Sequence, residues 1–105
     1  RTQNLWQNNK QKQYYTAITD TLRVYISDRY NLSAMEMTSN EILDILSKDK
    51  ELEQRVYEDL SSLLTTADLV KFAKYLASEE ENQDAIPIAV RFVNATFLQE
   101  LEENR

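Results

Sequence analysis

The stretch Met35-Glu36-Met37-Thr38-Ser39-Asn40-Glu41-Ile42-Leu43 decides how the chain is organised, because it combines a turn with the start of a helix. Thr38, followed three residues later by Glu41, is typical of a capping box. In this motif the hydroxyl accepts from the N–H of Glu41, and the carboxylate accepts from the N–H of Thr38. Met37 stands just before the box and is expected to pack onto Ile42. The stretch therefore predicts a joint between two helices, with Met35 and Met37 filling the turn.

Glu36 is the charged residue at the centre of this joint. A buried carboxylate without a partner is costly, so Glu36 would need a basic side chain beside it. We expect one of three residues to supply that side chain: Arg23, Arg29 or Lys71. The expected role of Glu36 is structural, because such an ion pair would tie the joint to the bundle.

The composition favours helices and restricts the chemistry. The 105 residues include no Gly, one Pro, no Cys and no His. Glycine supplies the positive φ of hairpin turns and the close approach of phosphate loops, so its absence argues against β-hairpins and nucleotide loops. Without Cys and His there is no thiol catalysis, no Ser-His triad and no zinc site of the usual kind.

Apolar residues recur at spacings of three and four along most of the chain, which predicts amphipathic helices. Residues 1–9 are expected to form a short helical turn that ends at Asn8-Asn9. Five longer helical segments are expected at 10–30, 38–47, 49–64, 65–77 and 84–101, with 78–83 as a solvated acidic loop. The predicted fold is all-α, a compact bundle of five to six helices in a single domain over residues 1–105.

Three of these helix boundaries rest on particular residues. Asn31 is expected to take the left-handed conformation that ends the segment 10–30. Thr65-Thr66 is expected to start a helix with Asp68 in its first turn. Asp84 is expected to cap the last helix, with Pro87 in the first turn.

The last two segments also carry predictions about their faces. Lys71 and Lys74 are expected on the outer side. The expected inward positions are Leu69, Val70, Phe72, Ala73 and Leu76 in one segment, and Ile86, Val90, Val93, Phe97 and Leu101 in the other.

The net charge of −6 is unevenly distributed. Residues 1–23 hold four basic residues and one acidic residue, a net charge of +3, so the rest of the chain is strongly acidic. Because nucleic-acid binding relies on clustered Lys and Arg, the overall balance predicts no nucleic-acid partner. Trp6 lies in the basic region and has two open interpretations, a lid on the core or an anchor at a membrane interface.

The carboxylates offer no convincing catalytic or metal site. Glu41 and Asp44 could share a helix face and do acid–base chemistry, but Glu41 already has a capping role. A di-iron site would want a Glu-x-x-His motif, and the acidic run 79–84 lacks the pattern of a calcium loop. The sequence therefore predicts a protein that is not an enzyme and has no cofactor or metal.

Three motifs in order resemble a known family. They are Leu5-Trp6-Gln7 with Lys12-Gln13-Tyr14-Tyr15, then Leu22–Ile26 continuing to Glu36–Leu43, then Ala67–Lys74, and Phe92–Thr96 fits the same pattern. Together they look like the cytosolic C-terminal tail of BatD-type proteins, the membrane-anchored oxygen-tolerance (Bacteroides aerotolerance) proteins. The chain departs from that pattern at Asn9 and Asn31, where Gly is common.

The resemblance implies a cytoplasmic domain that follows a membrane helix upstream of Arg1, on the inner side of the bacterial membrane. It also implies protein partners, namely MoxR-type ATPases and von Willebrand A domain proteins. The basic start of the chain agrees with the positive-inside rule. The alternative is a free-standing regulatory domain, or one that holds a small ligand between its helices. The residues expected to have structural or interaction roles are Trp6, Arg23, Arg29, Glu36, Thr38, Glu41, Asp68, Lys71 and Lys74.

Overall fold

The computed structural model describes the backbone of residues 2–103 and the side chains of residues 8–99 and 101. The described residues contain four α-helices and one short 3-10 turn. The helices are α1 (Thr2–Tyr30), α2 (Ser39–Leu46), α3 (Gln54–Phe72) and α4 (Glu79–Glu103), and the 3-10 turn η1 (Ala34–Glu36) lies between α1 and α2. No strand occurs in these residues, so the all-α prediction is confirmed. None of the helices over the described range is long and apolar enough to cross a membrane.

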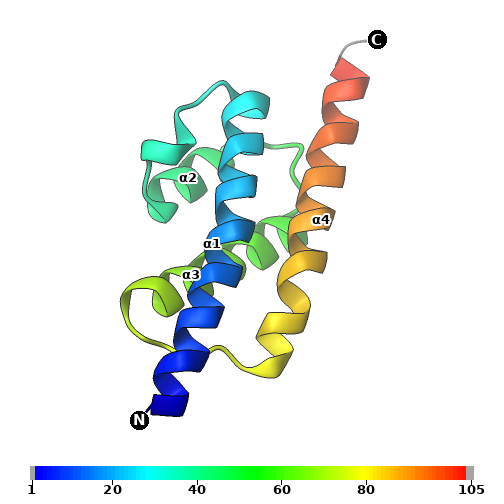
Figure 1. Cartoon of the computed structure of the whole chain (residues 1–105). Helices are drawn as coiled ribbons and strands as arrows, with labels where there is room; N and C mark the ends of the chain where they lie inside the picture. Colours follow the sequence, from blue (N-terminus) through cyan, green and yellow to red (C-terminus); the bar gives the residue numbers. More distant parts are fainter. Residues whose placement is uncertain (1, 104–105) are drawn as a thin grey trace.

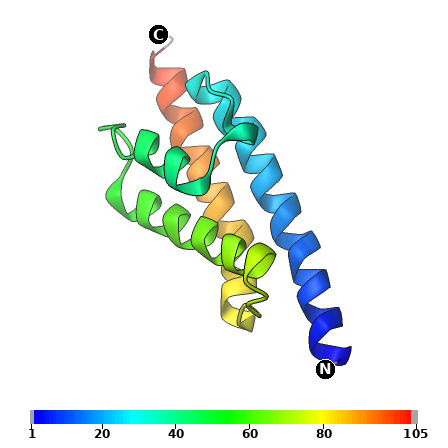
Figure 2. The same ribbon diagram turned by 90° about the vertical axis from the view of Figure 1, so that its left-hand side faces the viewer.

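The helices form an elongated bundle with principal extents of 55 × 26 × 18 Å. The two long helices, α1 and α4, lie side by side and run in the same direction (Figure 1). Both pack against α3, and α2 packs against α3. Figure 2 shows α2 and α3 together on one side of the α1–α4 pair, and the opposite side of the pair carries no other described helix.

The prediction of five to six helices is wrong, and one reason lies in α1. The helix does not break at Asn8-Asn9 but runs through 29 residues. Asn8 is buried, and its amide donates to the carbonyl of Tyr75 at 3.0 Å. This contact gives the Asn side chain a partner within the fold, so it does not need to compete with its own backbone.

The second reason is that residues 49–77 contain one helix instead of two. The buried stripe of α3 continues across Thr65-Thr66 without a change of spacing: Leu60, Leu63, Leu64, Ala67 and Val70. A threonine inside a helix costs only a few tenths of a kcal/mol, roughly, and burial of this stripe outweighs that cost. The helix ends at Phe72, five residues earlier than predicted, and Lys74 follows in the left-handed region with φ of 56°.

The start of α4 also differs from the prediction. Ser78, and not Asp84, begins the helix: its hydroxyl accepts from the N–H of Glu81 at 3.0 Å, while the Glu81 carboxylate accepts from the N–H of Ser78 at 2.8 Å. The expected loop 78–83 is therefore the cap and the first five residues of α4, and Pro87 lies inside the helix. A proline there removes one backbone donor from the helix interior.

Two local predictions are confirmed. The helix start at Thr38 forms a complete capping box with Glu41, with distances of 3.1 Å and 2.8 Å. Asn31 has a φ of 58°, and the N–H of Leu32 returns to the carbonyl of Ser27 at 3.0 Å. That bond is typical of a Schellman ending, so α1 stops where its sequence predicts.

The core lies where α1, α2, α3 and α4 meet. Its largest fully buried side chains are Tyr15, Phe92, Leu22, Ile26, Ile42, Leu46, Leu60, Leu64 and Val70. The α1 residues and Leu60 and Leu64 follow the spacing of three and four that predicts amphipathic helices. In α4, however, the residues that are buried in the core are Ala85, Phe92 and Thr96. Four of the five residues predicted to face inward are about half exposed: Ile86, Val90, Phe97 and Leu101. The fifth, Val93, is partly buried.

The α3 face shows a similar difference. Val70 is buried as predicted, but Leu69 and Phe72 are exposed, with Phe72 at 79%. Ala73 and Leu76, also predicted to face inward, are exposed as well. Leu69 and Phe72 belong to α3 but lie off its buried stripe, whereas Ala73 and Leu76 come after the helix has ended at Phe72.

Candidate functional site

The joint between α1 and α2 is held by Arg23. Its guanidinium donates to the carbonyl of Ala34 at 2.7 Å and also to the carbonyl of Met37. Ser27 adds a second link, because its hydroxyl accepts from the N–H of Ala34 at 3.0 Å and donates to the carbonyl of Arg23 at 2.8 Å. The Ala34 carbonyl already accepts from the N–H of Met37 at 3.2 Å, so the guanidinium is its second, charged donor.

The predicted role of Glu36 is wrong, because Glu36 is exposed and no burial has to be offset. Met35 is also exposed, at 53%, so only Met37 packs against the core. The three residues predicted to pair with Glu36 form hydrogen bonds with other groups. Arg23 binds backbone carbonyls of the joint, Arg29 donates from Nε to the carbonyl of Thr96 at 3.1 Å, and Lys71 donates from Nζ to Thr19 Oγ1 at 3.1 Å.

Lys71 and Asp68 depart from their predicted places. Lys71 is half-buried against α1 instead of lying on the outer side, and burial, with Arg23 nearby, lowers its pKa. Asp68 lies in the interior of α3, away from any first turn, and its charge opposes the lowering of the Lys71 pKa. Lys74 is exposed as predicted. The Trp6 side chain falls outside the described residues, although its backbone belongs to α1.

A polar network surrounds the start of α4. The Glu81 carboxylate accepts hydrogen bonds from the hydroxyls of Tyr75 at 2.7 Å and Thr66 at 3.4 Å, in addition to the N–H of Ser78. These donors, with the backbone bond from Ser78 first, lower the pKa of Glu81. The network joins α3 and the segment after it to the start of α4, so its role is to hold these elements together.

Tyrosine hydroxyls connect α1 to α4 along their length. Tyr14 donates to the carbonyl of Asn82 at 2.7 Å, and Tyr15 donates to the side-chain oxygen of the same residue at 2.8 Å. Tyr25 Oη and Thr96 Oγ1 lie 2.6 Å apart. Burial raises the pKa of Tyr15 to about 12. These bonds fix the rotation of α4 about its axis, because they hold Asn82 and Thr96 against α1.

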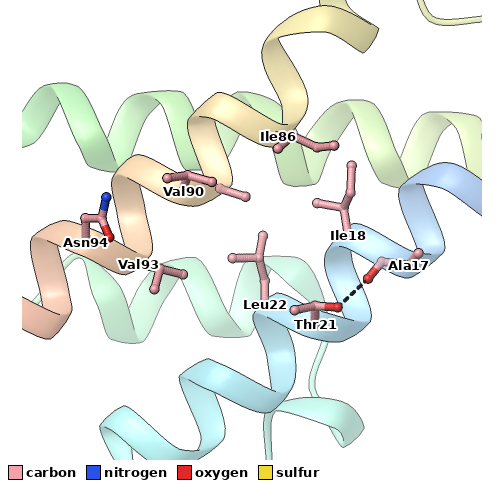
Figure 3. Close-up of a pocket in the computed structure, with 9 residues that line it drawn as sticks. Ala17, Ile18, Thr21, Leu22, Ile86, Val90, Val93 and Asn94 are labelled. Carbon is pink, nitrogen blue, oxygen red and sulfur yellow. Dashed lines mark hydrogen bonds between the residues drawn. The ribbon is translucent and has the colours of Figure 1, made fainter.

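An apolar groove runs between α1 and α4 on the side that no other described helix covers (Figure 3). Its volume is about 510 Å³, and its lining contains no charged residue. Thr21 and Asn94 are the polar members, and the Thr21 hydroxyl is already bonded to the carbonyl of Ala17 at 2.8 Å. The other lining residues are Ala17, Ile18, Leu22, Ile86, Ala89, Val90 and Val93.

The groove exists because α4 has two apolar faces. One face, with Ala85 and Phe92, is buried in the core. The other is the stripe predicted to face inward, and it continues beyond the groove through exposed Phe97, Leu98 and Leu101. The sequence signal for this site is therefore present, but the same spacing is equally typical of a stripe that packs in the core.

No group of three or more carboxylates in the described residues is arranged to hold a metal ion. Glu41 is occupied by the capping box, and Asp44 forms an exposed ion pair with Lys48 at 3.6 Å. The α1–α4 groove is thus the feature that most resembles a binding site.

Comparison of the chain with protein-family models, with curated proteins and with solved structures gives no match. The resemblance to BatD-type tails therefore stays a prediction from the sequence motifs.

Proposed function

We propose that this chain is a non-catalytic helical domain that binds a helix of a partner protein in the α1–α4 groove. The observation that carries this proposal is the α4 stripe predicted to face inward, four of whose five members are about half exposed. Its members, Ile86, Val90, Val93, Phe97 and Leu101, follow one another at spacings of four, three, four and four. Such spacing is typical of a seam that packs against another helix.

The size of the exposed apolar surface supports a macromolecular partner. Ile86, Val90, Phe97, Leu98 and Leu101 are each 49–58% exposed. Five large side chains in this state on one helix expose apolar surface on the order of 400 Å², which is within the range of the largest patches on monomeric proteins, and such patches are often functional. An amphipathic helix laid in a groove buries this kind of surface.

A small ligand is less well supported as the occupant. The volume of about 510 Å³ falls in the usual range for ligand pockets. Such sites orient their ligand through a few well-placed polar groups, and this lining offers only Thr21 and Asn94. The free-standing regulatory or ligand-binding domain is therefore the second candidate.

The sequence motifs supply the setting for the partner. They favour the cytoplasmic part of a membrane-anchored Bat-type protein, with MoxR-type ATPases or von Willebrand A domain proteins as partners. In the full-length gene product, an apolar span of about 20 residues should then lie directly before Arg1. A start codon at that place would contradict the membrane-anchored setting.

The groove can be tested with purified candidate partners from the same bacterium. We expect calorimetry to detect binding of the chain to one of them, and Val90→Asp to weaken it at least tenfold, because the charge would be buried on the seam. Phe72→Asp is the matched control, since Phe72 is an exposed apolar residue outside the groove. Binding that survives Val90→Asp unchanged, or its absence with every candidate at all salt concentrations, would refute the proposal.

A further inference from the structure

One face of α4 carries a line of six residues that are all exposed. They follow one another at spacings of four, three, four, three and four, which is the period of a coiled coil, about 3.5 residues. This period keeps one helix in contact with a second helix over its whole length. We call these residues the α4 seam: Gln83, Pro87, Val90, Asn94, Phe97 and Leu101.

Asn94 is the polar residue between the apolar members of the α4 seam. Its side chain is exposed at the groove (Figure 3), and it forms no hydrogen bond with any residue that the structure describes. An amide is both a donor and an acceptor, so another amide can match it completely. A single Asn in a coiled-coil seam specifies the register and the number of helices. The α4 seam therefore matches a copy of itself.

The charges near the α4 seam allow an acidic copy to approach. The chain has a net charge of −6, so two copies repel one another over most of their surface. Residues 85–99 of α4 contain no carboxylate, although the chain has 18 acidic residues. The lining of the α1–α4 groove also contains no charged residue. Repulsion between two copies is therefore weakest when they meet at this face.

The direction of the helices selects one arrangement of two copies. Because α1 and α4 lie side by side and run in the same direction (Figure 1), a two-fold axis parallel to them places α4 of each copy over the groove of the other. A two-fold axis perpendicular to them stacks each helix on its own copy, so the two grooves face one another and stay unfilled. The parallel arrangement also brings identical residues level, and Asn94 then meets the same residue of the other copy.

The surface covered in the parallel arrangement suits a stable dimer. The exposed apolar side chains of α4 supply on the order of 400 Å² per copy. Exposed Ala17 and Thr21 on the α1 side of the groove, together with the remaining seam residues, raise this to roughly 600–800 Å² per copy. The total for two copies is roughly 1,200–1,600 Å², which falls within the range of specific interfaces.

We propose that, when no other partner is present, two copies of this chain form a parallel two-fold dimer in which α4 of each copy occupies the α1–α4 groove of the other. This inference rests on the proposed function, because it names a helix that the groove binds. A helix of another protein then has to displace α4 of the second copy, so self-association and partner binding exclude one another.

Sedimentation equilibrium of the 105-residue chain alone tests the dimer. We expect a monomer–dimer equilibrium with a dissociation constant in the micromolar range, the weak end for an interface of this size. Added salt should strengthen the dimer, because it screens the repulsion between two acidic copies. Asn94→Asp keeps the shape of the side chain but places two carboxylates against one another, so it should weaken the dimer at least tenfold. Asn40→Asp, the same change at an exposed position of α2, should leave the dimer unchanged.

A second measurement determines the direction of the paired helices. The chain has no Cys, so Val90→Cys introduces a single thiol on the α4 seam. The two copies of this position are level in the parallel dimer, so mild oxidation should join the chains through a disulfide. Met35→Cys is the matched control, because Met35 is exposed on η1, outside the groove, and its oxidation should be much slower.

Three results would overturn the dimer: a chain that stays monomeric at every concentration and salt, a dimer that Asn94→Asp leaves intact, or crosslinking of Val90→Cys that is no faster than that of Met35→Cys. A monomeric chain that still binds a candidate partner in calorimetry would overturn this inference and leave the proposed function standing. A chain that dimerises as expected but binds no candidate would refute the proposed function alone.

Discussion

Replacing Arg23 with Ala should destabilise the fold more than any exposed arginine can. The guanidinium supplies hydrogen bonds to the carbonyls of Ala34 and Met37, and Ala34 is fully buried. A hydrogen bond from a charged donor contributes about 1.5–3 kcal/mol, and Arg23 is half-buried, so the two bonds together should contribute roughly 2–4 kcal/mol. For a domain of this size that loss corresponds to a fall in Tm of about 8–16 °C.

Urea unfolding followed by circular dichroism measures the change in the free energy of unfolding. Arg91→Ala is the matched control, because Arg91 is exposed and forms an ion pair with partly exposed Asp59 at 3.8 Å. Such pairs contribute about 0–1 kcal/mol. Arg23→Lys keeps the charge but offers one ammonium in place of the guanidinium, so an intermediate loss is expected.

One effect opposes the loss in Arg23→Ala. The Arg23 charge is among the causes that lower the pKa of Lys71, so its removal relieves a repulsion and should raise that pKa. The measured loss is therefore a lower bound on the contribution of the two hydrogen bonds. If the free energies of unfolding of Arg23→Ala and Arg91→Ala differ by less than about 0.5 kcal/mol, the reasoning about the joint is refuted.

Two further predictions concern α4 and the tyrosines. Phe92→Ala should lower the free energy of unfolding in urea by about 3–5 kcal/mol, because the ring is fully buried. Phe97→Ala should lower it much less, because Phe97 is 49% exposed. Equal losses would contradict the assignment of the Phe92 face of α4 to the core. Burial raises the pKa of Tyr15 from 10.0 to about 12, so the stability that its neutral form contributes is complete below pH 10 and is lost as the pH rises through 12. The free energy of unfolding, measured from pH 9 to 12, should therefore fall less steeply for Tyr15→Phe than for the parent chain. Identical slopes for the two proteins would contradict this.

Local signals in the sequence were reliable where neighbours along the chain make the contact. Thr38 and Glu41 satisfy one another within a single turn, so the capping box follows from the residues alone. The Ser78-x-x-Glu81 pattern is of the same kind and marks the start of α4, although the acidic residues that follow Ser78 favour a solvated loop when taken alone. Asn31 ended α1 as predicted because its left-handed conformation needs no distant partner.

Contacts between segments far apart in the chain decided the rest. Asn8 continues a helix because Tyr75, 67 residues away, accepts from its amide. Arg23 is one of the three residues predicted to pair with Glu36, and it binds backbone carbonyls of the joint instead. A backbone carbonyl leaves no trace in the sequence, so its demand for a donor could not be seen.

The sequence by itself determined that the chain is helical, where α2 begins and where α1 ends, because period and caps are local properties. Only the tertiary structure decided which apolar face of α4 is buried. Both faces have helical spacing, so periodicity alone cannot rank them. Hydrogen bonds from Tyr15 to Asn82 and between Tyr25 and Thr96 set the rotation of α4, and that rotation buries Phe92 and leaves the stripe of Val90 and Phe97 open beside α1.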